Sequence, residues 1–159
     1  MKKIDKKAQI KILKIILIMI WMITIFIFSS QKGTESGDTS RKFTIIIIQI
    51  ITGKTLELNS PFVEGVQLFI RKFAHFTIYA IGGFLIMNYA DSTNKTMKQK
   101  MLYSIGFGGT YAITDEIHQF FVPGRSGNII DVGIDTLGVI TGVLIYVVLK
   151  SLIEKIARK

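Results

Sequence analysis

The chain contains no cysteine. This absence excludes disulfide bonds, thiol catalysis and cysteine-ligated metal sites. Acidic residues are also scarce, because 11 Asp and Glu stand against 20 Lys and Arg, giving a formal net charge of +9. Such a basic balance is typical of proteins that meet nucleic acid or an anionic membrane surface. Here the basic residues flank apolar runs without aromatic residues interleaved, so a nucleic-acid partner is not expected.

Long apolar runs dominate the rest of the composition. Hydrophobic residues make up 49% of the 159 residues, and the mean hydropathy is +0.44. The runs predict an all-α membrane protein with four transmembrane helices, in a single domain over residues 1–159. The expected spans cover roughly residues 12–28, 66–90, 101–121 and 129–149. No small-residue cleavage pattern follows the first run, which therefore predicts a retained anchor and not a cleaved signal peptide.

The connection between the first two spans has two parts. Residues 29–40 read SSQKGTESGDTS, a composition typical of turns. Residues 42–54 read KFTIIIIQIITGK, and this apolar core is too short to span as a helix. We expect an interfacial or re-entrant segment here; a buried strand is the alternative, although it would lack a partner in lipid. Pro61 is expected to lie in the first turn of the next helix.

The distribution of basic residues predicts the orientation. Five of them lie in the connections after spans one and three: Lys32, Arg41, Lys42, Lys54 and Arg125. Thirteen lie before span one, between spans two and three, or after span four: Lys2, Lys3, Lys6, Lys7, Lys11, Lys14, Lys95, Lys98, Lys100, Lys150, Lys155, Arg158 and Lys159. The positive-inside rule therefore predicts that both termini of this multi-pass protein are cytoplasmic.

All four predicted spans bring polar or charged residues to the predicted outer side of the membrane. At about 1.5 Å per residue, Arg71, Asp115 and Asp135 each lie on the order of 10 Å inside the outer boundary, so one cluster is expected. Arg71, His75 and Tyr79 share one helical face. Ionisable groups inside a membrane indicate a functional site. Helix capping and a purely stabilising ion-pair network remain open alternatives.

The residue types suggest roles within this cluster. Arg71, Lys72 and Arg125 suit phosphate binding. Glu116 and His75 are the candidate general base and acid, with Asp115 beside them. The remaining candidate ligand-binding residues are Tyr79, Gln119, Asp131, Asp135, Ser30 and Gln31. A metal site drawn from His75, Glu116, His118, Asp131 or Asp135 is chemically allowed, but no H-E-x-x-H or repeated acidic motif occurs; we predict neither a metal nor a cofactor.

Three segments resemble the VanZ-like family of bacterial membrane proteins, named for a teicoplanin-resistance protein. They are FSSQ at residues 28–31, RKFAHFTIYAIGG at 71–83 and TDEIHQFFVPGRSGNIIDVGIDTLG at 114–138. The resemblance implies a place in the bacterial cytoplasmic membrane and a link to glycopeptide (teicoplanin-type) antibiotic resistance or cell-envelope maintenance. It supplies no reaction.

Two classes of function fit this combination. The first is an enzyme acting on the head group of a membrane lipid or a lipid-linked envelope precursor. The second is a non-enzymatic binder or scaffold that shields such a precursor or a lipophilic glycopeptide. Transport by a monomer is disfavoured, because polarity confined to one leaflet offers no continuous polar path.

Overall fold

The computed structural model describes residues 5–53 and 61–158, which form helices and no strand. The helices are α1 (Lys6–Ser29), α2 (Gly33–Thr52), α3 (Pro61–Ala90), α4 (Met97–Phe120) and α5 (Ile129–Ala157). The predicted all-α class is confirmed, and α3 begins at Pro61 as expected. Four of the basic residues used for the orientation, Lys2, Lys3, Lys54 and Lys159, lie outside the described residues.

Three of these helices, α1, α3 and α5, are long and apolar enough to cross a membrane. The helix α4 has 24 residues, the same length as α1. Its hydropathy is lower because charged residues lie near both of its ends, including Lys98, Lys100 and Glu116. The chain is thus a helical membrane protein, and the fourth span stays a prediction.

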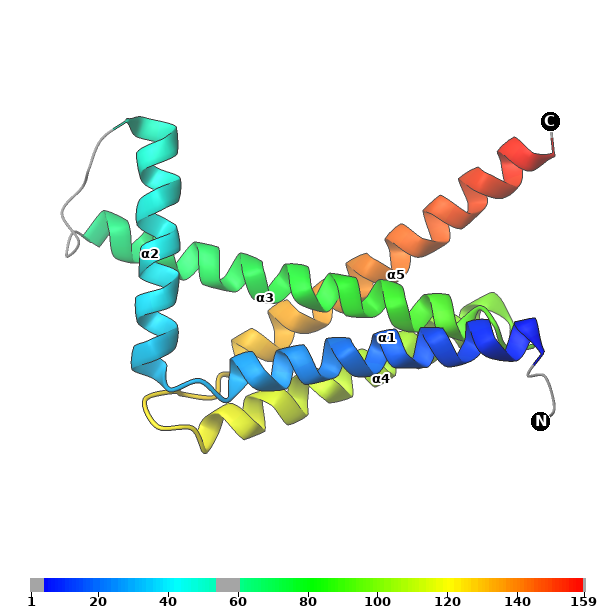
Figure 1. Ribbon diagram of the computed structural model, residues 1–159, viewed down its shortest axis with the longest axis horizontal. Helices are drawn as coiled ribbons and strands as arrows, with labels where there is room; N and C mark the ends of the chain where they lie inside the picture. Colours follow the sequence, from blue (N-terminus) through cyan, green and yellow to red (C-terminus); the bar gives the residue numbers. More distant parts are fainter. Residues whose placement is uncertain (1–4, 54–60, 159) are drawn as a thin grey trace.

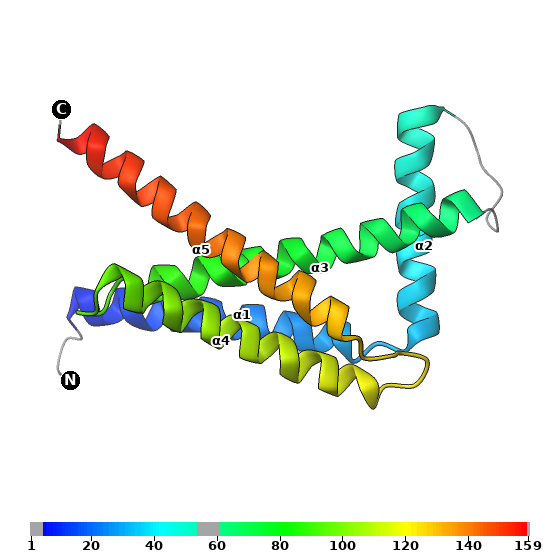
Figure 2. The same cartoon turned by 180° about the vertical axis from the view of Figure 1, so that it is seen from behind.

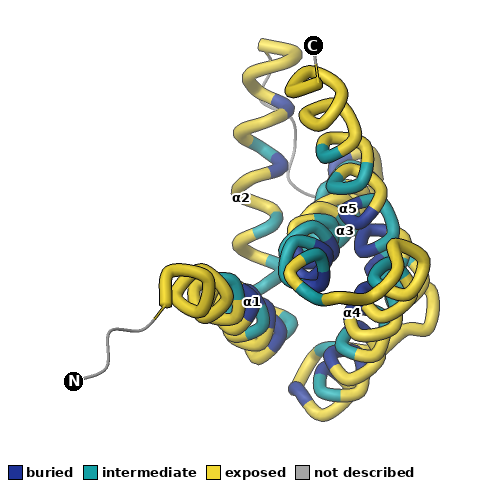
Figure 3. Tube along the Cα trace, turned by 90° about the vertical axis from the view of Figure 1, so that its right-hand side faces the viewer, coloured by how far each residue is buried: buried dark blue, intermediate teal, exposed yellow. Residues whose placement is uncertain are grey.

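The bundle is polar at both ends and brings distant segments together. The helices α1, α3 and α4 run side by side, α5 crosses α3, and α2 stands across the bundle (Figures 1 and 2). The start of α1, the α3–α4 turn and the end of α5 lie at one end (Figure 1). The α1–α2 corner and the α4–α5 turn lie at the other. Buried positions concentrate where the neighbouring helices face α3 (Figure 3).

Glycines allow the closest packing, between α3 and α5. A Cβ atom at Gly142 would lie 1.8 Å from the Ala80 carbonyl oxygen, and one at Gly138 would lie 2.4 Å from that of Phe76. The G-x-x-x-G pair therefore sets this helix contact, as small residues do in membrane bundles. Aromatic side chains join α1 to the same core: the Trp21 indole donates to the Ile78 carbonyl at 2.8 Å.

The predicted connection between the first two spans differs from the structure, because most of it forms the helix α2. Residues 33–40, expected as a turn, are helical, so α2 is a 20-residue helix, and the strand alternative is wrong for residues 42–52. Its hydroxyl groups bond within the helix: Thr39 donates to the Glu35 carbonyl at 2.9 Å and Thr44 to the Ser40 carbonyl at 2.8 Å. Gly53 ends the helix with a φ of 65°. Lys54, the last residue of the predicted segment, lies outside the described residues.

The helix α5 extends beyond the predicted fourth span. Residues 150–157 continue the helix to Ala157. Lys150 supports this extension, because its ammonium contacts both carboxylate oxygens of Asp91, at 2.7 and 2.6 Å, and approaches Glu154 one turn later. Lys100 and Tyr146 also donate to Asp91, at 2.9 and 3.0 Å. We call Asp91, Lys100, Tyr146 and Lys150 the Asp91 cluster.

Candidate functional site

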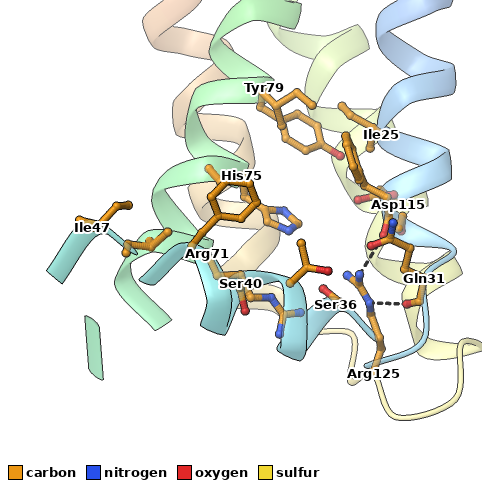
Figure 4. Close-up of a pocket in the computed structure, with 17 residues that line it drawn as sticks. Ile25, Gln31, Ser36, Ser40, Ile47, Arg71, His75, Tyr79, Asp115 and Arg125 are labelled. Atoms are coloured by element: carbon orange, nitrogen blue, oxygen red, sulfur yellow. Dashed lines mark hydrogen bonds between the residues drawn. The ribbon is translucent and has the colours of Figure 1, made fainter. Parts of the chain in front are cut away.

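A cavity lies at the end of the bundle opposite the Asp91 cluster. It has a volume of about 440 Å³ and is bounded by α1, α2, α3, α4 and the α4–α5 turn; we call it the α2 pocket. Its apolar lining includes Ile25, Phe28, Phe43, Ile47, Ile70 and Ile78. Its polar lining includes Ser29, Gln31, Ser36, Ser40, Arg71, His75, Tyr79, Asp115 and Arg125 (Figure 4).

Arg125 links the α4–α5 turn to the end of α1 and to α4 at the edge of the pocket. Its guanidinium donates to the carbonyl oxygens of Gln31 at 3.0 Å and Phe28 at 2.8 Å, and to the Gln119 side chain at 3.3 Å. These bonds satisfy carbonyl groups at the end of α1, as basic side chains commonly do at helix C-termini. The α4–α5 turn also packs closely against the start of α2. A Cβ atom at Gly33 would lie 1.8 Å from the Gly124 carbonyl oxygen.

Arg71 differs from Arg125 in having no such partners. It forms no hydrogen bond or ion pair with any residue in the described ranges. Its side chain reaches toward the same space as that of Arg125, near Ser36 (Figure 4). Burial, followed by the nearby charge of Arg71, lowers the pKa of Arg125 from its usual value. Two guanidinium groups therefore face one cavity, which the Asp115 carboxylate also lines.

A second group of residues, which we call the three-helix cluster, borders the pocket. It consists of His75, Glu116 and Asp135. They come from α3, α4 and α5, and one ligand atom of each lies within 4.8 Å of the others. The His75 Nδ1 atom is 3.5 Å from Asp135 Oδ1. Asp135 is fully buried. Within the described residues, neither of its carboxylate oxygens has a hydrogen-bond partner.

The two carboxylate oxygens of Glu116 differ in their hydrogen bonding. Its Oε2 atom accepts a hydrogen bond from the Asn128 backbone N–H at 2.8 Å, at the start of α5. Its Oε1 atom is buried, and no hydrogen bond to it is present in residues 5–53 or 61–158. Since His75 also lines the α2 pocket, this free oxygen belongs to a cluster that borders the cavity.

Asp115, Gln119 and Tyr79 occupy the inner part of the site. The Gln119 amide donates to Asp115 at 3.1 Å, which links Asp115 through Gln119 to Arg125. Tyr79 is fully buried, packs edge-on against Trp21, and lines the pocket. Its hydroxyl group has no hydrogen-bond partner in the described parts of the chain.

Several sequence-predicted residues lie outside the pocket lining or contribute differently from expectation. Lys72 forms an ion pair with Asp131 between α3 and α5, away from the cavity lining. Ser30 bonds to the Phe26 carbonyl and to His118. His118 stacks on Phe26, and so it lies on the α1 side of α4 and not in the three-helix cluster. Gln31 lines the pocket and supplies a backbone carbonyl to Arg125.

The structure also places residues in the site that were not predicted. Ser29, next to Ser30, is buried against the pocket, and Ser36 and Ser40 reach it from α2. Ser36, Ser40, Phe43 and Ile47 follow helical spacing, a signal that extends through the residues read as a turn. Gln67 on α3 anchors this face, because its amide donates to Ser40 at 2.8 Å and to the Gly37 carbonyl at 3.0 Å.

Together these groups offer two kinds of chemistry. The arginines, serines and apolar walls suit an amphiphile with an anionic head group. The imidazole and two carboxylates suit proton transfer or cation binding.

The chain was compared with known proteins. The model of the VanZ/LLP1 family matches residues 14–150, which cover α2, α3, α4 and the α4–α5 turn completely and most of α1 and α5. No curated protein and no solved structure gives a match. Since the family model covers more than half of the chain, including both the α2 pocket and the three-helix cluster, the protein belongs to the VanZ/LLP1 family.

Proposed function

We propose that this VanZ/LLP1-family membrane protein binds the anionic head group of an envelope lipid or lipid-linked precursor in the α2 pocket. In this proposal α4 is a fourth span, both termini are cytoplasmic, and the pocket lies in the outer leaflet of the bacterial cytoplasmic membrane. The high density of lysine at the end of the bundle that carries the start of α1 and the end of α5 supports this orientation. Binding of this kind would connect the protein to teicoplanin-type resistance or envelope maintenance.

One observation carries the proposal: Arg71 faces a cavity with apolar walls and has no anionic partner among the described residues. A cavity of about 440 Å³ lies within the usual range for ligand pockets, about 300–1,000 Å³. Arg71 offers a planar set of donors to phosphate, and Arg125 adds charge on the opposite side. The apolar walls suit the first part of a lipid tail, whereas a whole glycopeptide is larger than the cavity.

The helix α2 supports entry from the membrane. It stands across the bundle (Figure 1). It exposes Ile46, Ile50 and Ile51 while its polar residues Ser36 and Ser40 line the cavity. An amphipathic helix of this kind fits the boundary between head groups and acyl chains. In that position α2 would cover a lipid that enters sideways from the outer leaflet.

Arg71→Ala tests the proposal, with Lys72→Ala as the matched control. Both changes remove one cation from neighbouring positions of α3, but Lys72 is paired with Asp131 and lies outside the pocket lining. In nanodiscs containing phosphatidylglycerol and phosphatidylcholine, native mass spectrometry should show anionic lipid retained by the wild type. We expect about tenfold weaker retention in Arg71→Ala, because a charge-assisted hydrogen bond contributes roughly 1.5–3 kcal/mol. Equal retention by wild type and Arg71→Ala would refute the proposal.

Catalysis on the bound head group is the second candidate function. It is favoured by the free Oε1 atom of Glu116 in a cluster that borders the pocket through His75. Lipid mass spectrometry of cells with matched expression of wild type and Glu116→Gln separates the two functions. A lipid species that changes with the wild type alone indicates an enzyme. An unchanged lipid profile with retained resistance indicates binding or shielding.

A further inference from the structure

The three-helix cluster has the composition and spacing of a metal site. His75, Glu116 and Asp135 offer one nitrogen and two carboxylate ligands within 4.8 Å of one another. Bonds of about 2.0–2.2 Å to a tetrahedral ion place neighbouring ligand atoms about 3.4 Å apart. The 3.5 Å between His75 Nδ1 and Asp135 Oδ1 already meets this spacing. The Glu116 ligand atom lies within 4.8 Å of the other two, and a shift toward them would complete the set.

The burial of the carboxylates is an independent sign that this cluster binds a cation. Asp135 is 0% exposed and Glu116 is 5% exposed. Three of their four oxygens, both of Asp135 and Oε1 of Glu116, have no hydrogen-bond partner within residues 5–53 and 61–158. Buried carboxylates without partners are costly, so native structures normally pair them or use them to coordinate metals.

No nearby side chain fills this role. Lys72 is held by Asp131, and Arg125 is held by the end of α1 and by Gln119. Arg71 lies in the α2 pocket and forms no ion pair with the described residues. Within residues 5–53 and 61–158, His75 is therefore the one basic side chain that pairs with Asp135, and it lies close to two carboxylates.

We propose that His75, Glu116 and Asp135 bind one divalent transition-metal ion, with Zn²⁺ and Mn²⁺ as the best-suited ions. An imidazole with carboxylates fits these ions better than Mg²⁺ or Ca²⁺, which prefer oxygen ligands alone. The Asn128 N–H orients Glu116 through Oε2 and leaves Oε1 for the metal, as outer hydrogen bonds do in metal sites. Three protein ligands leave a fourth position open for water or a ligand oxygen.

This inference departs from the sequence prediction of no metal. The ligands come one from each of three helices, so no short motif marks them. It also goes beyond the proposed function, because the site is defined without reference to any lipid. An experiment can therefore refute the metal site without refuting lipid binding, and the reverse.

Metal binding is tested on full-length protein purified in detergent without a histidine tag and treated with chelator. Zn²⁺ or Mn²⁺ alone is then added, bound metal is counted by elemental mass spectrometry, and affinity is measured by calorimetry. We expect one ion per chain in the wild type and at least tenfold weaker binding in Asp135→Asn and His75→Gln. His118→Ala is the matched control, because it removes the other of the two histidines and should bind like the wild type. Wild type without a stoichiometric ion, or Asp135→Asn with unchanged affinity, would overturn the proposal.

A second measurement needs no variant. Pulsed electron paramagnetic resonance of wild-type protein loaded with Mn²⁺ should show coupling to one imidazole nitrogen. A spectrum of a fully oxygen-coordinated ion would mean that the metal sits elsewhere, and would overturn the assignment to His75. Neither measurement includes lipid, so loss of lipid binding in Arg71→Ala leaves these results unaffected.

Discussion

Asp91 and Asp135 are two aspartates at opposite ends of the same pair of helices, α3 and α5. Asp91 receives hydrogen bonds from Lys100, Lys150 and Tyr146, which use both of its oxygens. Asp135 is more deeply buried, yet its closest titratable partner is one histidine at 3.5 Å.

This difference separates a structural cluster from a functional one. Where a polar group serves stability, its hydrogen bonds are satisfied, as at Asp91. Where charged groups stay buried without partners, the protein forgoes stability, and such sites in membrane proteins are functional by default. The end of the bundle with Asp135 also holds the α2 pocket and the unpaired Arg71. This contrast supports the proposal that function lies at the Asp135 end, whereas the Asp91 cluster links α5 to the α3–α4 turn.

The largest effect is expected from Gly142→Ala, which separates the helices that both clusters share. The added Cβ atom would lie 1.8 Å from the Ala80 carbonyl oxygen, a backbone atom that has little room to move. Overpacking costs about 1–3 kcal/mol, and we expect the upper end of that range, with both clusters lost. Gly133→Ala in the same helix is the control, since nothing lies within 4 Å of its added Cβ. Equal thermal stability of the two variants in detergent would contradict the observed α3–α5 contact.

A smaller effect is expected from Asp91→Asn, and it depends on pH. Burial alone would raise the pKa of Asp91, but hydrogen bonds from Lys150, Lys100 and Tyr146 outweigh it and lower the pKa from 3.8 to about 2. Because the folded-state pKa is depressed, the stabilisation is present above the unfolded value and is lost as pH falls from about 4 to about 2. The shift corresponds to about 2 kcal/mol.

The measurement is reversible unfolding in mixed detergent micelles at several pH values. Wild type should lose about 2 kcal/mol more than Asp91→Asn across this window, and the two should converge at the acidic limit. Parallel pH profiles for both proteins would show that Asp91 is not the stabilising carboxylate at this end.

The sequence predicts most of the helices and part of the candidate site. Apolar runs predicted α1, α3 and α5, because lipid requires long uninterrupted helices. The same reasoning placed Arg71, His75 and Asp135 at one end. It missed the first half of α2, since glycine, serine and aspartate indicate turns while their hydroxyl groups can also bond within a helix. It also chose Ser30 instead of Ser29 for the pocket, because helix rotation at the end of α1 is set by packing.

The cluster itself shows a second limit of the sequence. Spacing along a helix reports which residues share a face, and it placed Arg71, His75 and Tyr79 on one side of α3. This spacing does not report how far apart two neighbouring helices lie. Lys72 therefore looked equivalent to Arg71, although the structure pairs Lys72 with Asp131 outside the pocket.

The smallest expected effect on stability, with the opposite sign, comes from Asp135→Asn. The change removes a buried carboxylate whose oxygens have no hydrogen-bond partner among the described residues, while keeping its shape. Asp135 faces His75 at 3.5 Å without a hydrogen bond, so removing its charge removes a desolvation cost that this contact offsets only in part, and unfolding measured in chelator should shift by about 0 to +1 kcal/mol. The same variant should lose the metal ion, which makes stability and binding change independently. If Asp135→Asn instead unfolds as easily as Asp91→Asn, the three-helix cluster stabilises the fold and the contrast between the two ends disappears.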